Sequence, residues 1–488
     1  MSSTTATEPI LIAGVRVSPD HLIGGVRVPS PDRFVTLSPI DGAPLGHVAC
    51  GGPAEAAAAV GAAAAAFPEW AALGPAGRAA ALHRLADLID SQVDEIATVE
   101  CADMGMLLAS LRARVIARAA MNFRNYADLA VAYQERDWHS KGTWNRVQRM
   151  PAGPVAVITP WNAPFMLSTW KVAPALAAGC TVVLKPAEWS PLSASLLADL
   201  TVAAGFSPGV FNLLQGTGER TGAALVADPR LARISFTGSP ETARQIAATA
   251  GANLVPFTGE LGGKGPLIVC EDADLELAAA RAAGQYDDAG QVCLAGTRLL
   301  VQASIADAFL ERFDAHVAAH VLGDPRSPET TIAPLIHPEH LTRVQGFVDR
   351  AVSDGHALLR GGHRLDGLFF EPTLIAPHSN DAEIVQSEVF GPVLTFQTFT
   401  DEAEAIALAN STRYGLSGIV FTASMGRAER IGRALRAGVV WVNTFLVRDL
   451  TAPFGGCGIS GIGREGGNYA LDFYSDLKTL QILEGSVG

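Results

Sequence analysis

The sequence lacks the features of a disulfide-stabilised, secreted protein. Its six cysteines are widely scattered and form no CxxC pair, which fits reduced thiols better than a disulfide framework. The first residues, MSSTTATEPI, contain neither a basic segment nor an apolar stretch, so we expect no secretory signal and a cytoplasmic protein. The cysteines are Cys50, Cys101, Cys180, Cys270, Cys293 and Cys457.

The sequence also lacks a long hydrophobic run and an excess of positive charge. The longest apolar run, Ala56 to Phe67, is rich in alanine and shorter than the roughly 20 residues of a membrane-spanning helix. We interpret it as a helix of a globular protein and expect no membrane partner. The net charge of −13 is opposite to the basic face that nucleic-acid binding requires, so we expect no nucleic-acid partner.

Signatures of several enzyme classes are missing. No GxSxG segment occurs, which argues against a serine hydrolase of the α/β type. Two histidine pairs, His316 with His320 and His337 with His340, lack the HExxH pattern and a nearby acidic third ligand. We therefore expect exposed helix histidines and no bound metal.

Two glycine-rich segments come close to phosphate-binding loops. Residues 216–222, GTGERTG, contain one residue too many for GxGxxG, and a turn is the preferred interpretation. Residues 260–266, ELGGKGP, have glycine where a phosphate loop needs Ser or Thr after the lysine. Neither segment alone predicts a nucleotide site.

The order of predicted elements indicates an α/β fold. A chain of 488 residues is expected to form two or three domains. Residues 54–135 are typical of successive helices, and from residue 151 short apolar runs alternate with helical segments near 169–178, 191–204, 219–227 and 240–250. This alternation predicts a parallel sheet with ligands at the carboxyl ends of its strands. The predicted strands are Val155–Ile158, Thr181–Leu184, Val210–Leu214, Arg233–Phe236 and Leu254–Phe257.

A second alternation begins near residue 265 and continues to about 443. It includes the predicted strands Pro266–Val269 and Leu299–Val301 and a helix over 304–318, so a second α/β domain is expected. The polar segment 134–150 is a poor core candidate, and Lys478–Ile482 alternates like an edge strand.

Polar residues follow the predicted strands where a ligand would bind. An asparagine, Asn162, lies between two prolines after one strand, and Lys185 and Glu188 follow the next, although a solvated surface pair is an equal alternative for these two. Ser239, before Pro240, is a helix N-cap that suits a pyrophosphate. For the cysteines other than Cys293, we prefer a role as buried small hydrophobic residues. The glycine-rich segments 453–456 and 461–465 are interpreted as structural loops.

Taken together, these segments resemble the aldehyde dehydrogenase superfamily over nearly the whole chain. The matching runs are PWNAPF, LKPAEWSP, FTGS, ELGGKGP, GQVCLAG, EVFGPV, NSTRYGL, PFGG and GIGREGG. The resemblance implies two Rossmann-like doubly wound domains and a small β oligomerisation element. Residues 1–133 and 151–260 would form the NAD-binding domain, 261–470 the catalytic domain, and 134–150 with 471–488 the oligomerisation element of a homodimer or homotetramer.

Carried over by position, the resemblance makes Cys293 the nucleophile, Glu260 the general base and Asn162 the oxyanion donor. Glu188 would bind the adenosine ribose and favour NAD over NADP. Ala243 stands where the family usually has the second glycine of its GSxxxG segment. The residues expected to bind NAD are Ile158, Thr159, Trp161, Lys185, Glu188, Gly218, Phe236, Gly238, Ser239, Thr242, Leu261, Glu388 and Phe390.

Chemistry supports this assignment of roles. A planar, neutral aldehyde does not readily release hydride, whereas thiolate addition gives a tetrahedral alkoxide that expels it. The alkoxide needs preorganised hydrogen-bond donors, each contributing about 3 kcal/mol. The resulting thioester must be hydrolysed, which requires a carboxylate that deprotonates a water molecule. A free thiol has a pKa near 8.5, so the site must also promote the thiolate.

Two further segments resemble the branch that oxidises hydroxymuconic-type semialdehydes, including 5-carboxymethyl-2-hydroxymuconate semialdehyde, from aromatic catabolism. They are the loop Val447–Leu450 and the run Val115–Phe123. Arg448 and Arg118 would bind a substrate carboxylate, because guanidinium groups bind carboxylates bidentately. The alternatives are a surface arginine with Arg448 paired to Asp449, a neutral aldehyde substrate, or a non-catalytic binding protein. Three residues would line the apolar part of the tunnel, Phe165, Trp170 and Phe454.

Overall fold

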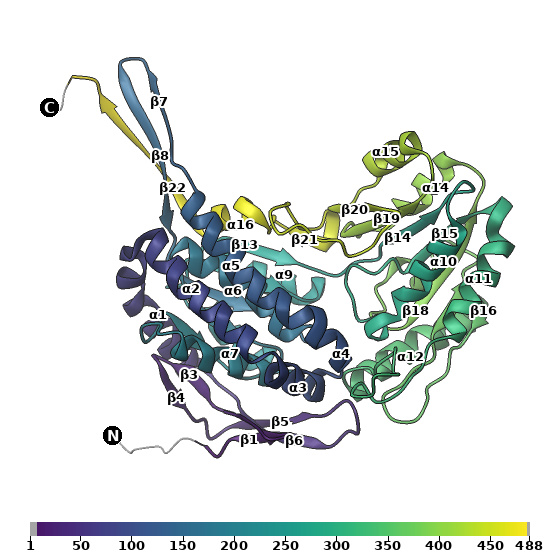
Figure 1. Ribbon diagram of the computed structural model, residues 1–488, viewed down its shortest axis with the longest axis horizontal. Helices are drawn as coiled ribbons and strands as arrows, with labels where there is room; N and C mark the ends of the chain where they lie inside the picture. The colour runs from purple at the N-terminus through teal and green to yellow at the C-terminus, as the bar shows by residue number, and fades with distance from the viewer. Residues whose placement is uncertain (1–6, 486–488) are drawn as a thin grey trace.

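The computed structural model describes residues 7–485. Two large sheets dominate it, each in its own lobe, and a narrow three-stranded sheet projects from one lobe (Figure 1). The two lobes are joined where β13 (Phe257–Glu260) leads through a short segment into β14 (Pro266–Val269). The predicted base, Glu260, is therefore the last residue of the first sheet before the chain crosses to the second lobe.

The first sheet has eight strands around a parallel centre. Its central order is β13, β12 (Arg233–Thr237), β9 (Pro154–Ile158), β10 (Thr181–Lys185) and β11 (Phe211–Leu213). Three antiparallel strands lie at its edges, β21 (Gly461–Ile462), β3 (His21–Ile23) and β4 (Val26–Val28). The strand order reverses between β9 and β12, and ligands of doubly wound sheets bind at this kind of switch point.

Most of the predicted strands of this sheet are confirmed, but the strand over Leu254–Phe257 is wrong. Leu254 adopts a left-handed conformation with φ 57° and is 90% exposed. The strand β13 instead begins at Phe257 and ends at Glu260. Part of the apolar run lies in the turn after helix α9 (Pro240–Ala252). The prediction failed because hydrophobic composition alone does not distinguish a turn from a strand.

Helices cover both faces of the first sheet. The predicted helical stretch 54–135 forms α1 (Pro53–Ala72), α2 (Gly74–Ser91), α3 (Val93–Met104), α4 (Leu108–Ser110), a π-helical turn (Leu111–Val115) and α5 (Ile116–Ala132). The run Ala56 to Phe67 lies within α1, as expected. Between the strands lie α6 (Pro164–Ala178), α7 (Leu192–Ala203), a π-helical turn (Gly218–Gly222) with α8 (Ala223–Val226), and α9 (Pro240–Ala252).

The second sheet has seven strands, all parallel except β16. Their order is β16 (Ala357–Arg360), β17 (Thr373–Ala376), β18 (Val393–Phe399), β15 (Arg298–Gln302), β14, β19 (Ser417–Phe421) and β20 (Val439–Val442). The helices of this lobe are α10 (Leu275–Ala283), α11 (Ala306–Ala318), α12 (Pro338–Ser353), α13 (Glu383–Gln386), α14 (Glu402–Ala409) and α15 (Met425–Ala434). The second α/β alternation is thereby confirmed.

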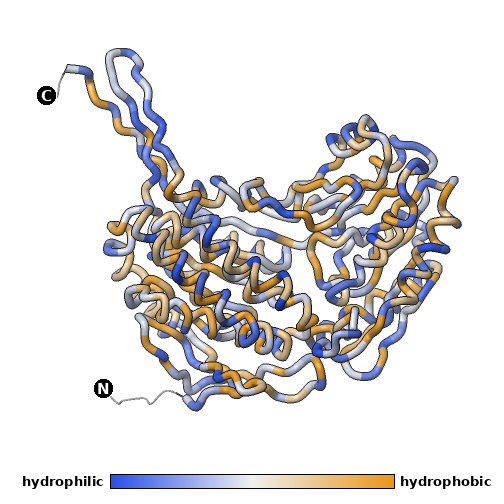
Figure 2. The backbone as a smooth tube through the Cα atoms, in the orientation of Figure 1, coloured by the Kyte–Doolittle hydropathy of each residue, from blue (hydrophilic) through white to orange (hydrophobic). Residues whose placement is uncertain are grey.

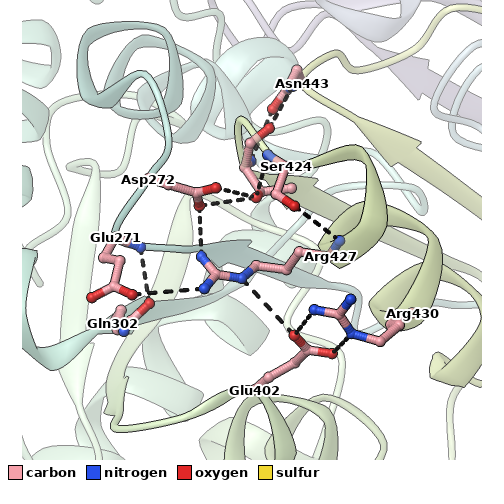
Figure 3. A network of polar contacts seen from close by, with 9 residues as sticks. Glu271, Asp272, Gln302, Glu402, Ser424, Arg427, Arg430 and Asn443 are labelled. Atoms are coloured by element: carbon pink, nitrogen blue, oxygen red, sulfur yellow. Dashed lines mark hydrogen bonds and ion pairs between the residues drawn. The ribbon is translucent and has the colours of Figure 1, made fainter.

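The carboxyl edge of the second sheet is occupied by a polar network (Figure 3). Arg427 lies at its centre, with its Nη1 atom 2.7 Å from Asp272 Oδ1. Thr422 and Asn443 bond to each other at the ends of β19 and β20, and Arg430 pairs with Glu402 at 2.9 Å. The opposite, amino edge of the second sheet is the one reached by the chain from the first lobe, because Gly263 and Cys293 precede β14 and β15.

A separate antiparallel sheet contains the two segments predicted to form an oligomerisation element. Its order is β22 (Ser475–Leu483), β8 (Thr143–Pro151) and β7 (Arg136–Ser140), and Lys478 pairs with Gln148. Figure 2 shows hydrophilic and hydrophobic residues mixed along this projecting sheet. The helix α16 (Gly467–Phe473) connects it to the body of the molecule.

Within residues 7–485, no single helix combines the length and apolar character needed to cross a membrane. Only α1 and α2 taken together pass that test, and they are bent by 114° at their junction.

Candidate active site

The loop after β9 reaches across to the second lobe. It follows Ile158, and the Thr159 hydroxyl lies 3.1 Å from that of Ser168 on α6, which ties the loop to the helix that follows it. The Asn162 amide donates to the main-chain oxygen of Gln291 at 2.9 Å. The predicted oxyanion donor therefore lies beside the segment that carries Cys293.

Lys185 and Glu188 do not form a solvated pair. Lys185, the last residue of β10, is 2% exposed, and its Nζ atom lies 3.0 Å from Glu188 Oε2. Burial would raise the pKa of Glu188, but the Lys185 ammonium group and main-chain donors outweigh it and keep that pKa below its usual range. The second carboxylate oxygen accepts a hydrogen bond from Gly218 N at 3.3 Å. Glu188 is thus an ionised acceptor at the sheet edge.

The helix α9 begins at the carboxyl end of β12, as predicted. Ser239 is its N-cap and accepts a hydrogen bond from Thr242 N at 3.2 Å. A Cβ atom on Gly238 would lie 2.4 Å from the Phe236 ring, so a side chain there would require that ring to move. Ala243, which replaces the second glycine of the family's GSxxxG segment, is buried within α9. The start of this thirteen-residue helix at the switch point carries the partial positive charge of the helix dipole, which favours an anion.

Glu388 and Phe390 approach the same place from the second lobe. Glu388 Oε1 accepts a hydrogen bond from Gly263 N at 2.8 Å, while a Cβ atom on Gly262 would lie 2.0 Å from its other oxygen. Phe390 has a φ of 61°, and its ring centroid lies 5.1 Å from that of Trp161. Leu261, next to these glycines, donates its N–H to Ser460 O at 2.9 Å. A side chain at Gly262 would therefore have to displace the Glu388 carboxylate.

Cys293 is half-buried in the turn that precedes β15. A Cβ atom on Gly263 would lie 2.2 Å from its carbonyl oxygen, so the chain between the two sheets crosses the cysteine backbone closely. Burial raises the pKa of the thiol to about 12, the carboxyl groups of Glu388 and Glu260 add to this, and Arg448 opposes it. Without cofactor or substrate, the site therefore holds a protonated thiol.

Glu260, the last residue of β13, is 5% exposed, and neither of its carboxyl oxygens has a hydrogen-bond partner among residues 7–485. Burial raises its pKa, and the nearby Glu465 carboxyl raises it further, while Lys171 lowers it. A carboxyl group with both oxygens free can bind a water molecule and take its proton.

The structure also reveals a buried ion pair that the sequence analysis missed. Lys171 Nζ lies 2.5 Å from Glu465 Oε1, and Trp170 Nε1 donates to the other oxygen at 2.6 Å. Glu465 stands in the GIGREGG run, which we interpreted as a structural loop, so that interpretation was incomplete. Lys171 gave no signal, because it follows Trp170 in an ordinary helical segment.

The two predicted substrate arginines lie over the same tryptophan. Their guanidinium carbons are 5.8 Å (Arg118) and 5.3 Å (Arg448) from the Trp170 ring centroid, and Arg448 is also 3.8 Å from that of Phe454. Among the described residues neither forms an ion pair, and Asp449 instead bonds to Thr451. The alternative in which Arg448 pairs with Asp449 is therefore wrong. Phe165 was expected to line the substrate tunnel, but it has no exposed surface, so that expectation is wrong.

The expectation of exposed helix histidines is wrong for His340. It is 4% exposed and its Nε2 atom lies 2.7 Å from the Phe390 carbonyl oxygen, because α12 packs against the segment that carries Phe390. His337 stacks on Trp189 with 4.6 Å between ring centroids, and His316 bonds to Glu276. No group of three His, Cys, Asp or Glu side chains suited to a metal ion occurs within residues 7–485. Four of the other five cysteines are buried, as expected, but Cys457 is half-buried.

The doubly wound sheets, the anion-binding helix start and the thiol between the lobes define an α/β protein with a dinucleotide-type site. The family is identified by comparison with known sequences. The profile of the Aldehyde dehydrogenase family matches residues 27–480. The chain belongs to the aldehyde dehydrogenase family, and it is an oxidoreductase that acts on the aldehyde group.

Among its relatives, 2-aminomuconic semialdehyde dehydrogenase of Danio rerio is 39% identical over 95% of this chain and 98% of its own length. The 5-carboxymethyl-2-hydroxymuconate semialdehyde dehydrogenase of Escherichia coli is 40% identical over 92% of this chain and 98% of its own length. The P. syringae indole-3-acetaldehyde dehydrogenase, solved with NAD+ and IAA, has a TM-score of 0.95 at 37% identity, with 97% of this chain and 98% of that chain covered. These likenesses confirm the predicted fold class.

Proposed function

We propose that this protein uses NAD to oxidise a carboxylate-bearing aldehyde, of the hydroxymuconic semialdehyde type, to the corresponding acid. The observation that carries the substrate assignment is the pair of half-buried guanidinium groups, Arg118 and Arg448, which lack a carboxylate partner within the described chain. Two of the relatives described above are named for semialdehydes of the muconic type.

The residues at the carboxyl edge of the first sheet fit NAD. Glu188 is an ionised acceptor suited to a ribose hydroxyl and would repel a 2′-phosphate. The N-terminus of α9 at Ser239 suits the pyrophosphate, and Glu388 with Phe390 lies where the nicotinamide half would reach Cys293. When bound, NAD accepts the hydride that leaves the substrate carbon.

The first half of the reaction oxidises the aldehyde and leaves its carbon bound to Cys293 as a thioester. The Cys293 thiolate adds to the aldehyde carbon, and the carbonyl oxygen becomes an alkoxide held by the Asn162 amide and the Cys293 N–H. When the alkoxide reforms its C=O bond, the carbon loses hydride to the oxidised cofactor, leaving a thioester on Cys293. Cys293 thereby holds the substrate carbon two electrons more oxidised than in the aldehyde, and the two electrons leave with the hydride that NAD would accept.

The second half is hydrolysis of the thioester. Glu260 takes a proton from a water molecule, whose oxygen attacks the thioester carbon, and the carbon–sulfur bond then breaks. The product leaves as a carboxylate, and the thiolate is restored for the next turnover. Both oxygens of Glu260 are free to serve this step.

The substrate assignment is tested by replacing Arg448. Arg448→Ala should raise KM for an acidic semialdehyde about tenfold or more, because a charge-assisted hydrogen bond contributes roughly 1.5–3 kcal/mol. The same change should barely affect benzaldehyde or hexanal. A matched control is Arg112→Ala. Arg112 lies on the π-helical turn before α5, and its guanidinium group pairs with Asp94 at 2.7 Å.

The outcomes separate the substrate from the reaction. Equal losses on acidic and neutral aldehydes would show that Arg448 acts structurally through its stacking on Phe454. A wild-type preference for neutral aldehydes would overturn the substrate assignment and leave aldehyde oxidation standing.

A further inference from the structure

Two carboxyl groups are buried on α3, and neither belongs to the residues proposed to bind the cofactor or the substrate. Glu100 and Asp103 are both 0% exposed, and because they are three positions apart they share one face of the helix. Within residues 7–485, neither is part of an ion pair. Burying a carboxyl group without a charge partner is costly, so the hydrogen bonds that these groups accept must matter.

Each carboxyl group accepts a main-chain hydrogen bond at the start of another helix. Glu100 Oε2 accepts from Phe165 N at 3.0 Å, and Phe165 is the second residue of α6. Asp103 Oδ2 accepts from Leu192 N at 2.7 Å, and Leu192 is the first residue of α7. The remaining oxygen of Asp103 accepts from the Thr36 hydroxyl at 2.9 Å.

Neither of these two helices caps itself. The N-cap residues are Ala163 for α6 and Pro191 for α7, and neither provides a side-chain cap. The first N–H groups of a helix have no partner within it, and a carboxyl oxygen placed there is favourable. One helix, α3, thus supplies from outside the caps of two helices that begin beside the site.

The loops that end at these caps carry the site residues. Asn162 stands three positions before Phe165, and Lys185 and Glu188 stand before Leu192. The loops also touch, because the Ser190 hydroxyl donates to the carbonyl oxygen of Trp161 at 3.1 Å. The positions of Glu100 and Asp103 on α3 therefore fix where both loops end and α6 and α7 begin.

We propose that Glu100 and Asp103 are positioning residues: Glu100 fixes the loop that carries Asn162, and Asp103 fixes the loop that carries Lys185 and Glu188. The consequence for catalysis rests on the proposed function. Loss of Glu100 should act on hydride transfer, through the oxyanion donor, and loss of Asp103 on dinucleotide affinity.

Carboxamide variants show whether Glu100 and Asp103 act as hydrogen-bond acceptors or through a negative charge. Burial raises the pKa of Glu100 to about 8 and that of Asp103 to about 7, and a protonated carboxyl group still accepts through its carbonyl oxygen. Glu100→Gln and Asp103→Asn keep that oxygen and the side-chain shape. Glu100→Leu and Asp103→Leu remove it.

Three measurements on the full chain test the proposal. The first is the rate of the NADH burst at saturating NAD and aldehyde, and the second is the Kd of NAD from tryptophan fluorescence. The third is amide hydrogen exchange in residues 159–167 and 186–194, which needs no activity. If the wild type oxidises no aldehyde, the proposed function fails, while the exchange data still report on both caps.

In Glu100→Leu, the burst rate should fall about tenfold or more and exchange should rise in residues 159–167, with Kd changed less than about threefold. In Asp103→Leu, Kd should rise about tenfold, exchange should rise in residues 186–194, and the burst rate at saturation should change less than about threefold. The Gln and Asn variants should remain within about threefold of wild type in all readouts.

Two results would overturn the proposal. One is that the Gln and Asn variants behave like the Leu variants, which would make charge the requirement. The other is that both Leu variants lower Tm, but Glu100→Leu does not act mainly on the burst rate and Asp103→Leu does not act mainly on the Kd of NAD. If Glu100→Leu does not fold, Glu100→Asp withdraws the oxygen from Phe165 N while keeping a carboxyl group, and it should reproduce the same loss.

Discussion

Cys293 and Glu260 are expected to separate the two halves of the reaction. Cys293→Ala should abolish aldehyde oxidation yet leave NAD affinity close to wild type, because the cofactor contacts lie on other residues. Glu260→Gln should still form the thioester and therefore show a burst of NADH followed by a depressed steady state. Rapid-mixing absorbance measurements check both variants. Turnover by Cys293→Ala, or an unchanged steady state in Glu260→Gln, would contradict the assigned roles.

The pKa values of the same residues predict a rise of activity with pH. Burial raises the pKa of the Cys293 thiol to about 12 and that of Glu260 above its usual range, and both act in their deprotonated forms. Raising the pH therefore increases the fraction of active groups, and kcat/KM should increase from about pH 6 to about pH 9. Alkylation of Cys293 by iodoacetamide, followed by mass spectrometry without cofactor, should rise over the same range. A plateau at neutral pH would contradict this account.

Glu188 is expected to determine the choice of dinucleotide. Its ionised carboxylate would repel a 2′-phosphate, so kcat/KM should favour NAD over NADP by about tenfold or more. Glu188→Ser should narrow this ratio, whereas Glu69→Ser on the exposed surface of α1 should leave it unchanged. Equal or better kinetics with NADP in the wild type would show that Glu188 does not face the ribose.

Sequence reasoning located residues at strand ends but not residues that meet across long separations. Asn162 follows a correctly predicted strand, so the carboxyl-edge rule placed it at the ligand edge. Glu260 was assigned through the family resemblance instead, because the strand predicted before it, Leu254–Phe257, is wrong. Lys171 and Glu465 are separated by 294 positions and form a pair only because α6 and the C-terminal segment pack against each other. Periodicity carries no information about such a contact.

In the segment between β13 and β14, close backbone approach limits which residues the sequence can contain. Gly263→Ala would place a Cβ atom 2.2 Å from the Cys293 carbonyl oxygen, so the nucleophile must move. We expect kcat to fall by about tenfold or more, since small displacements of catalytic groups are costly. Gly251→Ala is the matched control, because a Cβ atom there meets nothing within 4 Å inside α9. If both variants kept wild-type kcat, this close approach would not matter for catalysis.

The boundaries of helices and strands were less predictable from the sequence than their order along the chain. The helices over 53–132 and the alternation from residue 151 follow directly from composition and periodicity. The strand shift at Leu254 and the left-handed Phe390 do not, because the tertiary contacts of each segment determine its conformation. Phe390 is held by its contacts with Trp161 and His340.

For the whole molecule, the arrangement of the two lobes defines the site. The first sheet contributes its carboxyl edge and the second its amino edge, whereas Arg427 and its partners occupy the opposite edge of the second sheet (Figure 3). The sequence predicted two α/β units, but it did not predict which edges meet. That depends on the short connection from Glu260 to Pro266, which leaves the two lobes little freedom to separate.

The projecting sheet leads to the last prediction, which concerns assembly. The strand β22 is at the edge of this sheet and exposes Leu477 (64%) and Leu480 (40%), and an exposed edge of this kind pairs readily with another chain. We expect a dimer or tetramer with two-fold symmetry, in which this sheet contacts the partner. Sedimentation should give a mass of at least twice 50.9 kDa. Leu477→Glu with Leu480→Glu should shift it toward the monomer, whereas Leu11→Glu, at an equally exposed site (66%) on β1 (Ile10–Ile12), should not. A monomeric wild type at working concentration would reject this role for β22.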